Sequence, residues 1–240
     1  MDGNFLHVTF DIAAWAAAGL SLLWLTRHAG IRFPKSPSRD LSYIAALVFG
    51  AGIGAVLFGT ANLWLSQKTG IARSIEGAIA GGIVAVELFK RVAGIHTRTG
   101  ARFALSLAVG IAVGRVGCYL AGIEDFTYGT PTALPWGHDF GDGIIRHPVQ
   151  LYESATMAVF ALGYVICALR RNRFVVENGF YLAVGFYGLQ RFLLEFIKPY
   201  GALIGPFTLF HLLSAAILAY AIAMIATAPN PGIADDRAFA

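Results

Sequence analysis

Residues 178–197 read NGFYLAVGFYGLQRFLLEFI, an apolar run that carries one arginine, Arg191, and one glutamate, Glu195. About 20 residues are enough for a helix to cross the hydrocarbon of a bilayer. A charge in hydrocarbon costs several kcal/mol and is rarely tolerated unless it is paired or lines a polar cavity. The stretch therefore predicts a membrane-spanning helix that contributes two charged side chains to a polar site.

The whole chain has the composition of a membrane protein. Of its 240 residues, 57% are hydrophobic and only 13% are charged, whereas charged residues make up about 25% of soluble domains. Seven stretches are long and apolar enough to span a bilayer: 10–26, 41–66, 75–95, 103–122, 151–169, 178–197 and 207–228. We expect a single all-α domain over residues 1–228, built as a seven-helix transmembrane bundle, and a disordered tail over residues 229–240.

Lysine and arginine are concentrated in alternate connections between these stretches. The basic connections carry Arg27, Arg32, Lys35 and Arg39, then Lys90, Arg91, Arg98 and Arg102, then Arg170, Arg171 and Arg173. The other connections hold only Lys68 and Arg73, then Arg146, then Lys198. Because positively charged loops remain in the cytoplasm, the N-terminus is predicted outside and the C-terminus inside. Basic loops that face anionic lipid account for the net charge of +4 without a nucleic-acid partner.

Six ionisable side chains lie inside the predicted spans: Glu76, Glu87, Arg115, Glu153, Arg191 and Glu195. Arg191 and Glu195 are four residues apart and share a helix face. Glu87 is followed by Lys90 and Arg91, so we expect a pair on the helix surface there. For Arg191 two explanations remain: an ion pair that only neutralises itself, or a guanidinium group that binds a lipid phosphate through paired N–H groups.

The connection of residues 123–150 is longer than the others and rich in glycine, proline and aromatic residues. Long connections on a rigid scaffold are usually functional or disordered, and the apolar content here favours a packed lid on the outer face. It leads into RHPVQLYE, residues 146–153. Pro148 suits the first turn of the next helix. Arg146 and His147 would then lie at the outer mouth, with Glu153 deeper in the bundle.

Small residues recur at helical spacing in three spans. Gly50 and Gly54, Gly77 and Gly81, and Gly110 and Gly114 each place two glycines on one helix face, which predicts closely packed helices. The two cysteines, Cys118 and Cys167, fall in different spans near opposite faces, so no disulfide is expected. No cluster of Cys and His has the spacing of a structural zinc site.

Four runs of residues, in this order, resemble the phosphatidylglycerol–prolipoprotein diacylglyceryl transferases of bacterial inner membranes. They are Gly114–Gly117, Pro135–Trp136, Arg146–Glu153 and Tyr187–Phe196, and the resemblance extends over about residues 44–220. It implies a multi-pass enzyme of the inner membrane with seven spans. Such an enzyme transfers the diacylglyceryl group of phosphatidylglycerol to the lipobox cysteine of a prolipoprotein signal peptide and releases glycerol phosphate, with no metal or organic cofactor.

The resemblance also implies roles for individual residues. Arg115 and Arg191 would grip the phosphate, Arg146 would receive glycerol phosphate at the outer mouth, and Glu195 would orient Arg191. Gln150 and Tyr152 would bind headgroup hydroxyls. The remaining predicted site residues are Glu76 as a catalytic group, with His147, Glu153, Gly114 and Gly117 at the substrate. We expect the three guanidinium groups to converge on one pocket.

The chain departs from the family pattern at three places. Glu76-Gly77-Ala78 stands where the family has His-Gly-Gly, Gly52 stands where an arginine is usual, and Cys118-Tyr119-Leu120-Ala121 lacks two family asparagines. Three roles for Glu76 follow: a buried base with a raised pKa, a counter-charge for an arginine, or a residue at a lipid-facing edge.

Three functions are compatible with these residues. The first is a diacylglyceryl transferase that keeps the prolipoprotein acceptor or has changed it. The second is a non-catalytic membrane protein that binds or moves phospholipid. The third is a proton or ion pathway along Glu76, Glu153, Arg191 and Glu195.

Overall fold

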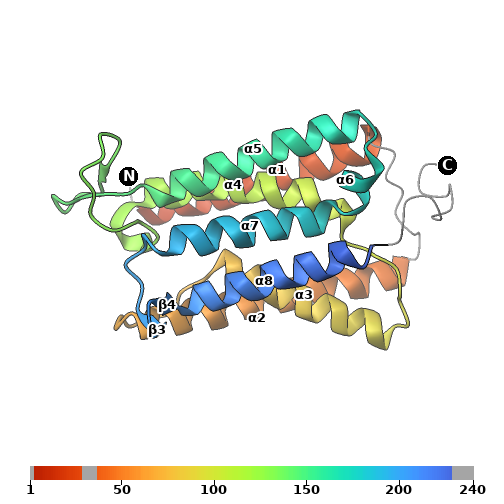
Figure 1. Cartoon of the computed structure of the whole chain (residues 1–240), viewed down its shortest axis with the longest axis horizontal. Helices are drawn as coiled ribbons and strands as arrows, with labels where there is room; N and C mark the ends of the chain where they lie inside the picture. Colours follow the sequence, from red (N-terminus) through yellow and green to blue (C-terminus); the bar gives the residue numbers. More distant parts are fainter. Residues whose placement is uncertain (1–2, 29–36, 229–240) are drawn as a thin grey trace.

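The computed structural model describes residues 3–28 and 37–228, and within them seven long helices run side by side (Figure 1). They are α1 (Gly3–His28), α2 (Pro37–Leu65), α3 (Ile75–Val92), α4 (Ala104–Ala121), α5 (Val149–Leu169), α7 (Gly179–Glu195) and α8 (Leu209–Ala226). Each coincides with one of the predicted stretches, and most ends agree to within two or three residues. The predicted tail over residues 229–240 lies outside the described residues.

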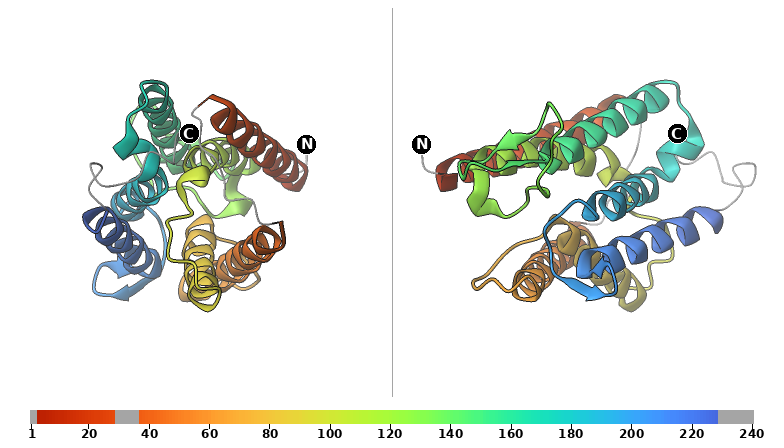
Figure 2. Two further views of the ribbon diagram at one scale, coloured as in Figure 1. Left: turned by 90° about the vertical axis from the view of Figure 1, so that its right-hand side faces the viewer. Right: turned by 60° about the vertical axis from the view of Figure 1, so that its left-hand side comes forward.

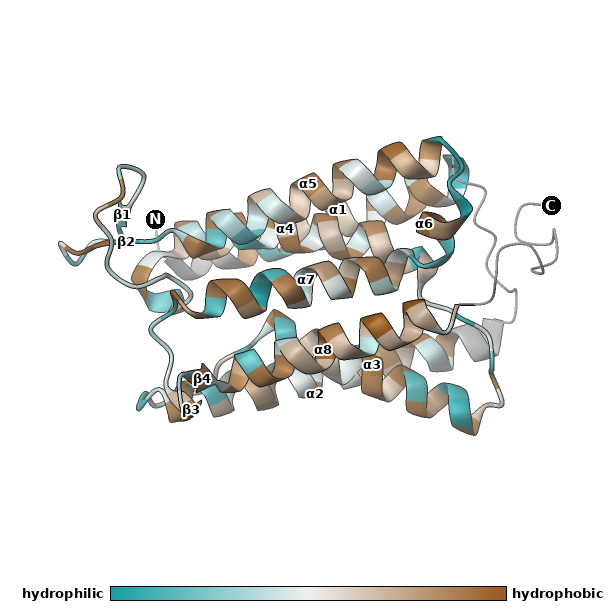
Figure 3. Cartoon of the chain, viewed as in Figure 1, coloured by the Kyte–Doolittle hydropathy of each residue, from teal (hydrophilic) through white to brown (hydrophobic). Residues whose placement is uncertain are grey.

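The chain is a mostly helical membrane protein. Five helical segments are long and apolar enough to cross a bilayer: Val8–His28, Leu41–Leu65, Ala101–Asp125, Val149–Leu169 and Leu209–Ala226. Most residues of the long helices are apolar, and hydrophilic residues gather in the connections, near the end of α3 and at one turn of α7 (Figure 3). Large side chains such as Trp15 and Phe49 are at least 70% exposed, as expected where lipid covers the helices. Helix α3 carries four charged side chains and α7 has 17 residues, so neither is among the five.

Glycines allow α2 and α3 to pack against each other at close range. Gly50 and Gly54 of α2 face Gly77 and Gly81 of α3, and a Cβ atom on Gly81 would lie 2.9 Å from the Cα of Gly54. The sequence expectation for these two motifs is confirmed. Helix α4 contacts both α1 and α5, and α7 packs on α8 (Figure 2).

Two connections lie together at one end of the bundle, which we call the loop end (Figure 1). Between α4 and α5 the chain forms the short helix η2 (Gly122–Asp125) and the antiparallel strands β1 (His138–Asp139) and β2 (Ile145–Arg146). Between α7 and α8 it forms β3 (Ala202–Ile204) and β4 (Phe207–Thr208). The connection predicted over residues 123–150 ends earlier, because α5 begins at Val149 with Pro148 as its N-cap. Pro148 was predicted in the first turn of this helix, and in the structure it lies directly before that turn.

The opposite end contains two shorter helices, η1 (Ala101–Phe103) and α6 (Arg173–Glu177). The predicted pair is present there, with the Lys90 ammonium 3.1 Å from Oε1 of Glu87, but Lys90 is buried and does not lie on the surface as expected. Tyr220 of α8 donates a hydrogen bond to the same oxygen. Cys118 and Cys167 are both free thiols, as predicted.

Candidate functional site

Arg191 is the centre of a buried cluster of charges. Its Nε donates to Oε2 of Glu76 at 3.1 Å, its Nη1 to Oε1 of Glu153 at 2.6 Å, and its Nη2 to Oε2 of Glu195 at 2.8 Å. The three carboxylates come from α3, α5 and α7. The predicted i,i+4 pair with Glu195 is thus confirmed, but it is one of three contacts, so Arg191 and Glu195 do not simply neutralise each other.

Two further cations complete the cluster through Glu153. Nε of Arg115 in α4 pairs with Oε2 of Glu153, and Nζ of Lys198 lies 3.1 Å from Oε1. Three carboxylates therefore face three cations, and each of the six residues is at most 6% exposed. Equal numbers of opposite charges are what a buried ionic group requires, because an unpaired buried charge is strongly destabilising.

Glu76 and Glu195 each bind Arg191 through one carboxylate oxygen, and a hydroxyl group donates a hydrogen bond to the other oxygen. Oγ of Ser214 donates to Oε1 of Glu76, and Oγ1 of Thr208 donates to Oε1 of Glu195, each at 2.6 Å. Thr208 is also the N-cap of α8 and forms a capping box with His211. Our sequence reasoning missed Thr208, Ser214 and Lys198. The signal was available for the first two, since Thr208, His211 and Ser214 recur every three residues and so share one face at the start of α8.

Glu76 is 1% exposed and lies in the first turn of α3, where a carboxylate is favoured by the helix dipole. The predicted alternative of a lipid-facing edge position is wrong, because Arg191 and Ser214 bind both of its oxygens. Ser214 lies on α8, 138 positions from Glu76, so nothing in the sequence indicated this contact.

Several buried polar atoms near the cluster have no hydrogen-bond partner among the described residues. They include both amide atoms of Gln150, the hydroxyl of Tyr187 and Nε2 of His211. Gln150 and Tyr187 are fully buried. Gln150 precedes Glu153 by three residues on α5, and Tyr187 precedes Arg191 by four on α7, so each shares a helix face with a member of the cluster. Buried polar groups are normally paired, and these are therefore candidates to contact a polar substrate.

Arg146 lies apart from the cluster, in the connection before α5. Its Nη1 and Nη2 bind the two carboxylate oxygens of Asp142 at 2.5 and 2.7 Å, and its guanidinium lies over the Tyr128 ring. These hydrogen bonds lower the pKa of Asp142 and raise that of Arg146. The expected convergence of three arginines thus holds for Arg115 and Arg191 only, because a carboxylate of the same connection binds Arg146.

His147 and Tyr152 belong to a second group at the loop end. Nε1 of Trp136 donates to the Tyr152 hydroxyl at 2.9 Å, and Nδ1 of His147 lies 3.4 Å from the same hydroxyl. The structure thus joins Pro135–Trp136 to Arg146–Glu153, two runs that are separate in the sequence.

Gly114 and Gly117 were predicted at the substrate, but both face α1. A Cβ atom on Gly114 would lie 3.8 Å from Cβ of Ala14, and one on Gly117 would overlap the Phe10 side chain. The missing side chains of these two glycines make room for α1 against α4, and a place for them at the substrate stays a prediction.

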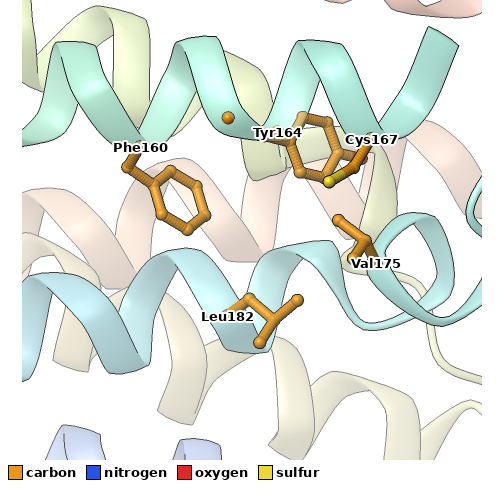
Figure 4. A pocket seen from close by; sticks show the side chains of 6 residues that line it. Phe160, Tyr164, Cys167, Val175 and Leu182 are labelled. Carbon is orange, nitrogen blue, oxygen red and sulfur yellow. The ribbon is translucent and has the colours of Figure 1, made fainter. Parts of the chain in front are cut away.

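A separate groove lies toward the other end of α5 (Figure 4). It has a volume of about 200 Å³ and is lined by Phe160, Gly163, Tyr164, Cys167, Val175 and Leu182. Its lining contains no charged side chain and shares no residue with the cluster, so the groove is separate from it.

Comparisons with known proteins agree with the motifs. The family model described as prolipoprotein diacylglyceryl transferase matches residues 9–227. Three curated relatives carry the name phosphatidylglycerol–prolipoprotein diacylglyceryl transferase. The protein from Geobacter sulfurreducens is 30% identical, over 77% of this chain and 75% of its own length. Those from Cupriavidus pinatubonensis and Methylocella silvestris are 31% and 33% identical, over 88% and 79% of this chain and 83% and 74% of their own lengths.

Proposed function

The chain belongs to the prolipoprotein diacylglyceryl transferase family, and from this we propose that it moves the diacylglyceryl group of phosphatidylglycerol to the cysteine thiol of a prolipoprotein. In this reaction the sulfur of the thiol forms a bond to the glyceryl carbon, and the thiol proton ends on the departing glycerol phosphate. The bond from that carbon to the phosphate oxygen breaks, and glycerol phosphate leaves with the electron pair. The product is a thioether.

One observation carries the proposal: a buried cluster in which three cations, Arg115 among them, surround the carboxylate of Glu153. The phosphate oxygen gains charge as the carbon–oxygen bond breaks, and fixed N–H donors in a site without water stabilise that charge most strongly. The cluster lies within a helical bundle whose outer surface is apolar, so a phospholipid reaches it from the bilayer.

In this proposal, Glu76 positions Arg191 and balances its charge. Both Glu76 oxygens already accept hydrogen bonds, one from Arg191 and one from Ser214. The buried amide of Gln150 is free to bind a glycerol hydroxyl. His147 and Tyr152 stand at the loop end, where the headgroup enters and glycerol phosphate departs.

The proposal includes a topology. All seven long helices span the inner membrane, with Glu76 of α3 and both charged residues of α7 buried inside the bundle. The alternation of basic connections supports an orientation with the loop end outside and the C-terminus in the cytoplasm. Secreted prolipoproteins then meet the enzyme on the side where they emerge.

The test is turnover by the purified full-length protein in micelles that contain phosphatidylglycerol and a lipobox peptide, followed by mass spectrometry of the peptide. We expect a mass gain equal to one diacylglyceryl group. Arg115→Ala should abolish this product, whereas Arg91→Ala, at an exposed position near the end of α3, should leave it unchanged. A wild-type protein that adds no diacylglyceryl group to the peptide contradicts the prolipoprotein acceptor.

The pH dependence of kcat/KM distinguishes two roles of Glu76, positioning Arg191 and accepting the thiol proton. If Glu76 positions Arg191, Glu76→Gln lowers kcat/KM by a similar factor at every pH. A change in the shape of the pH profile would instead identify Glu76 as the proton acceptor.

A further inference from the structure

The hydrogen bonds of Arg191 leave it poorly suited to bind a phosphate. Each of its three nitrogens already donates to a different carboxylate, those of Glu76, Glu153 and Glu195. Two of its five N–H groups remain, but a phosphate that bound them would lie beside three carboxylates, and like charges at close range repel each other. Arg191 therefore serves to hold the three acidic side chains in place.

Arg115 and Lys198 have donors to spare. Arg115 uses Nε for Glu153, and its Nη1 has only a weak contact to the sulfur of Cys118 at 3.9 Å. Nζ of Lys198 lies 3.1 Å from Oε1 of Glu153, an ion pair that uses at most one of its N–H groups. An ammonium group carries three N–H donors. Both cations thus retain donors, and they bind different oxygens of the same carboxylate.

The position of Lys198 suits contact with a headgroup. It lies three residues beyond the end of α7, at the loop end, and is 5% exposed. Its ammonium is 5.4 Å from the ring centre of Tyr200. Lys198 thus places a buried positive charge between the Glu153 carboxylate and the connection from α7 to α8.

We propose that Lys198 and Arg115 together form the seat for the phosphate, on either side of Glu153, and that Lys198 supplies the second cation that Arg146 does not. This assignment rests on the proposed function for the identity of the ligand. The seat recognises the phosphate of the lipid before the reaction and that of glycerol phosphate after it.

The ammonium of Lys198 also gives the seat a pH signature. Burial, together with the neighbouring Arg191 and Arg115, lowers the pKa of Lys198 to about 8, against the opposing effect of Glu153 and Glu195. Phosphate binding should therefore weaken as pH rises through about 8. Arginine at this position stays protonated throughout this range.

The experiment compares Lys198→Met and Lys198→Arg with a control, Lys68→Met. Lys68 is an exposed lysine that lies over the Phe126 ring. Binding of phosphatidylglycerol and of glycerol phosphate is measured separately by native mass spectrometry, and KM and kcat are measured across pH. Lys198→Met should weaken both ligands by about tenfold or more, the range for one charged hydrogen bond, and should raise KM more than it lowers kcat.

Lys198→Arg should bind both ligands as the wild type does, but its affinity for them should not fall above about pH 8. Unchanged binding of both ligands by Lys198→Met would overturn the assignment, as would an alkaline decline that persists in Lys198→Arg. Weakening of glycerol phosphate alone would also overturn it, because the lipid would then bind elsewhere. A wild-type protein that binds both ligands through Lys198 but transfers nothing would leave the seat intact and refute the proposed reaction instead.

Discussion

Replacement of Glu153 by glutamine tests whether the charge balance of the cluster stabilises the fold. Glu153 is fully buried and faces Arg115, Arg191 and Lys198. Glu153→Gln keeps the shape of the side chain but leaves three cations against two carboxylates. Loss of one partner from a buried ionic group costs about 3–5 kcal/mol. For a chain of this size each kcal/mol lowers Tm by about 2–4 °C, so we expect Tm to fall by roughly 6–20 °C.

The assay is thermal unfolding in detergent, with Glu177→Gln as the matched control. Glu177 pairs with Arg173 at 3.7 Å on α6, and both side chains are about one-third exposed, so that change should cost at most about 1 kcal/mol. A second substitution, Lys198→Met, restores equal numbers of charges and should recover part of the lost stability. If Glu153→Gln lowers Tm no more than Glu177→Gln does, the charge balance of the cluster does not stabilise the fold.

Two further predictions concern packing and the loop end. Gly81→Leu should separate α2 from α3 and unfold or strongly destabilise the protein, because the new side chain would overlap the backbone at Gly50. The control is Gly52→Ala, which should have little effect on Tm because a Cβ atom there meets nothing within 4 Å. Arg146 lowers the pKa of Asp142, so their pair stabilises the fold above the ordinary aspartate pKa of about 4 and loses this effect as pH falls through the lowered value. The difference in Tm between the wild type and Asp142→Asn should therefore be constant near neutral pH and shrink in acid. A difference that grows in acid would contradict a stabilising Arg146–Asp142 pair.

The positions of the helices could be read from the chain because apolar runs of about 20 residues have few alternatives to a helix in lipid. The stretch of residues 178–197 predicted α7, found at Gly179–Glu195. The Gly50/Gly54 and Gly77/Gly81 motifs likewise predicted where α2 and α3 meet, since small residues at helical spacing permit close contact.

The members of the cluster could also be identified in part. Charges in apolar runs must find partners, and this reasoning selected Glu76, Arg115, Glu153, Arg191 and Glu195, which do meet. The sequence had no means to show which partner each one takes. Spacing along a helix relates residues three or four apart, whereas Glu76 and Arg191 are separated by 115 positions.

Local sequence therefore determined the helices, the charged residues that had to be buried and the family of the chain. Only the tertiary structure decided that Arg146 binds Asp142 outside the cluster, that Gly114 and Gly117 face α1, and that Lys198 takes the third positive position. The physical reason is that hydrophobicity and helix geometry act over neighbouring residues. The pairing of buried charges depends instead on which helices pack together, and that is settled by contacts between side chains far apart in the sequence.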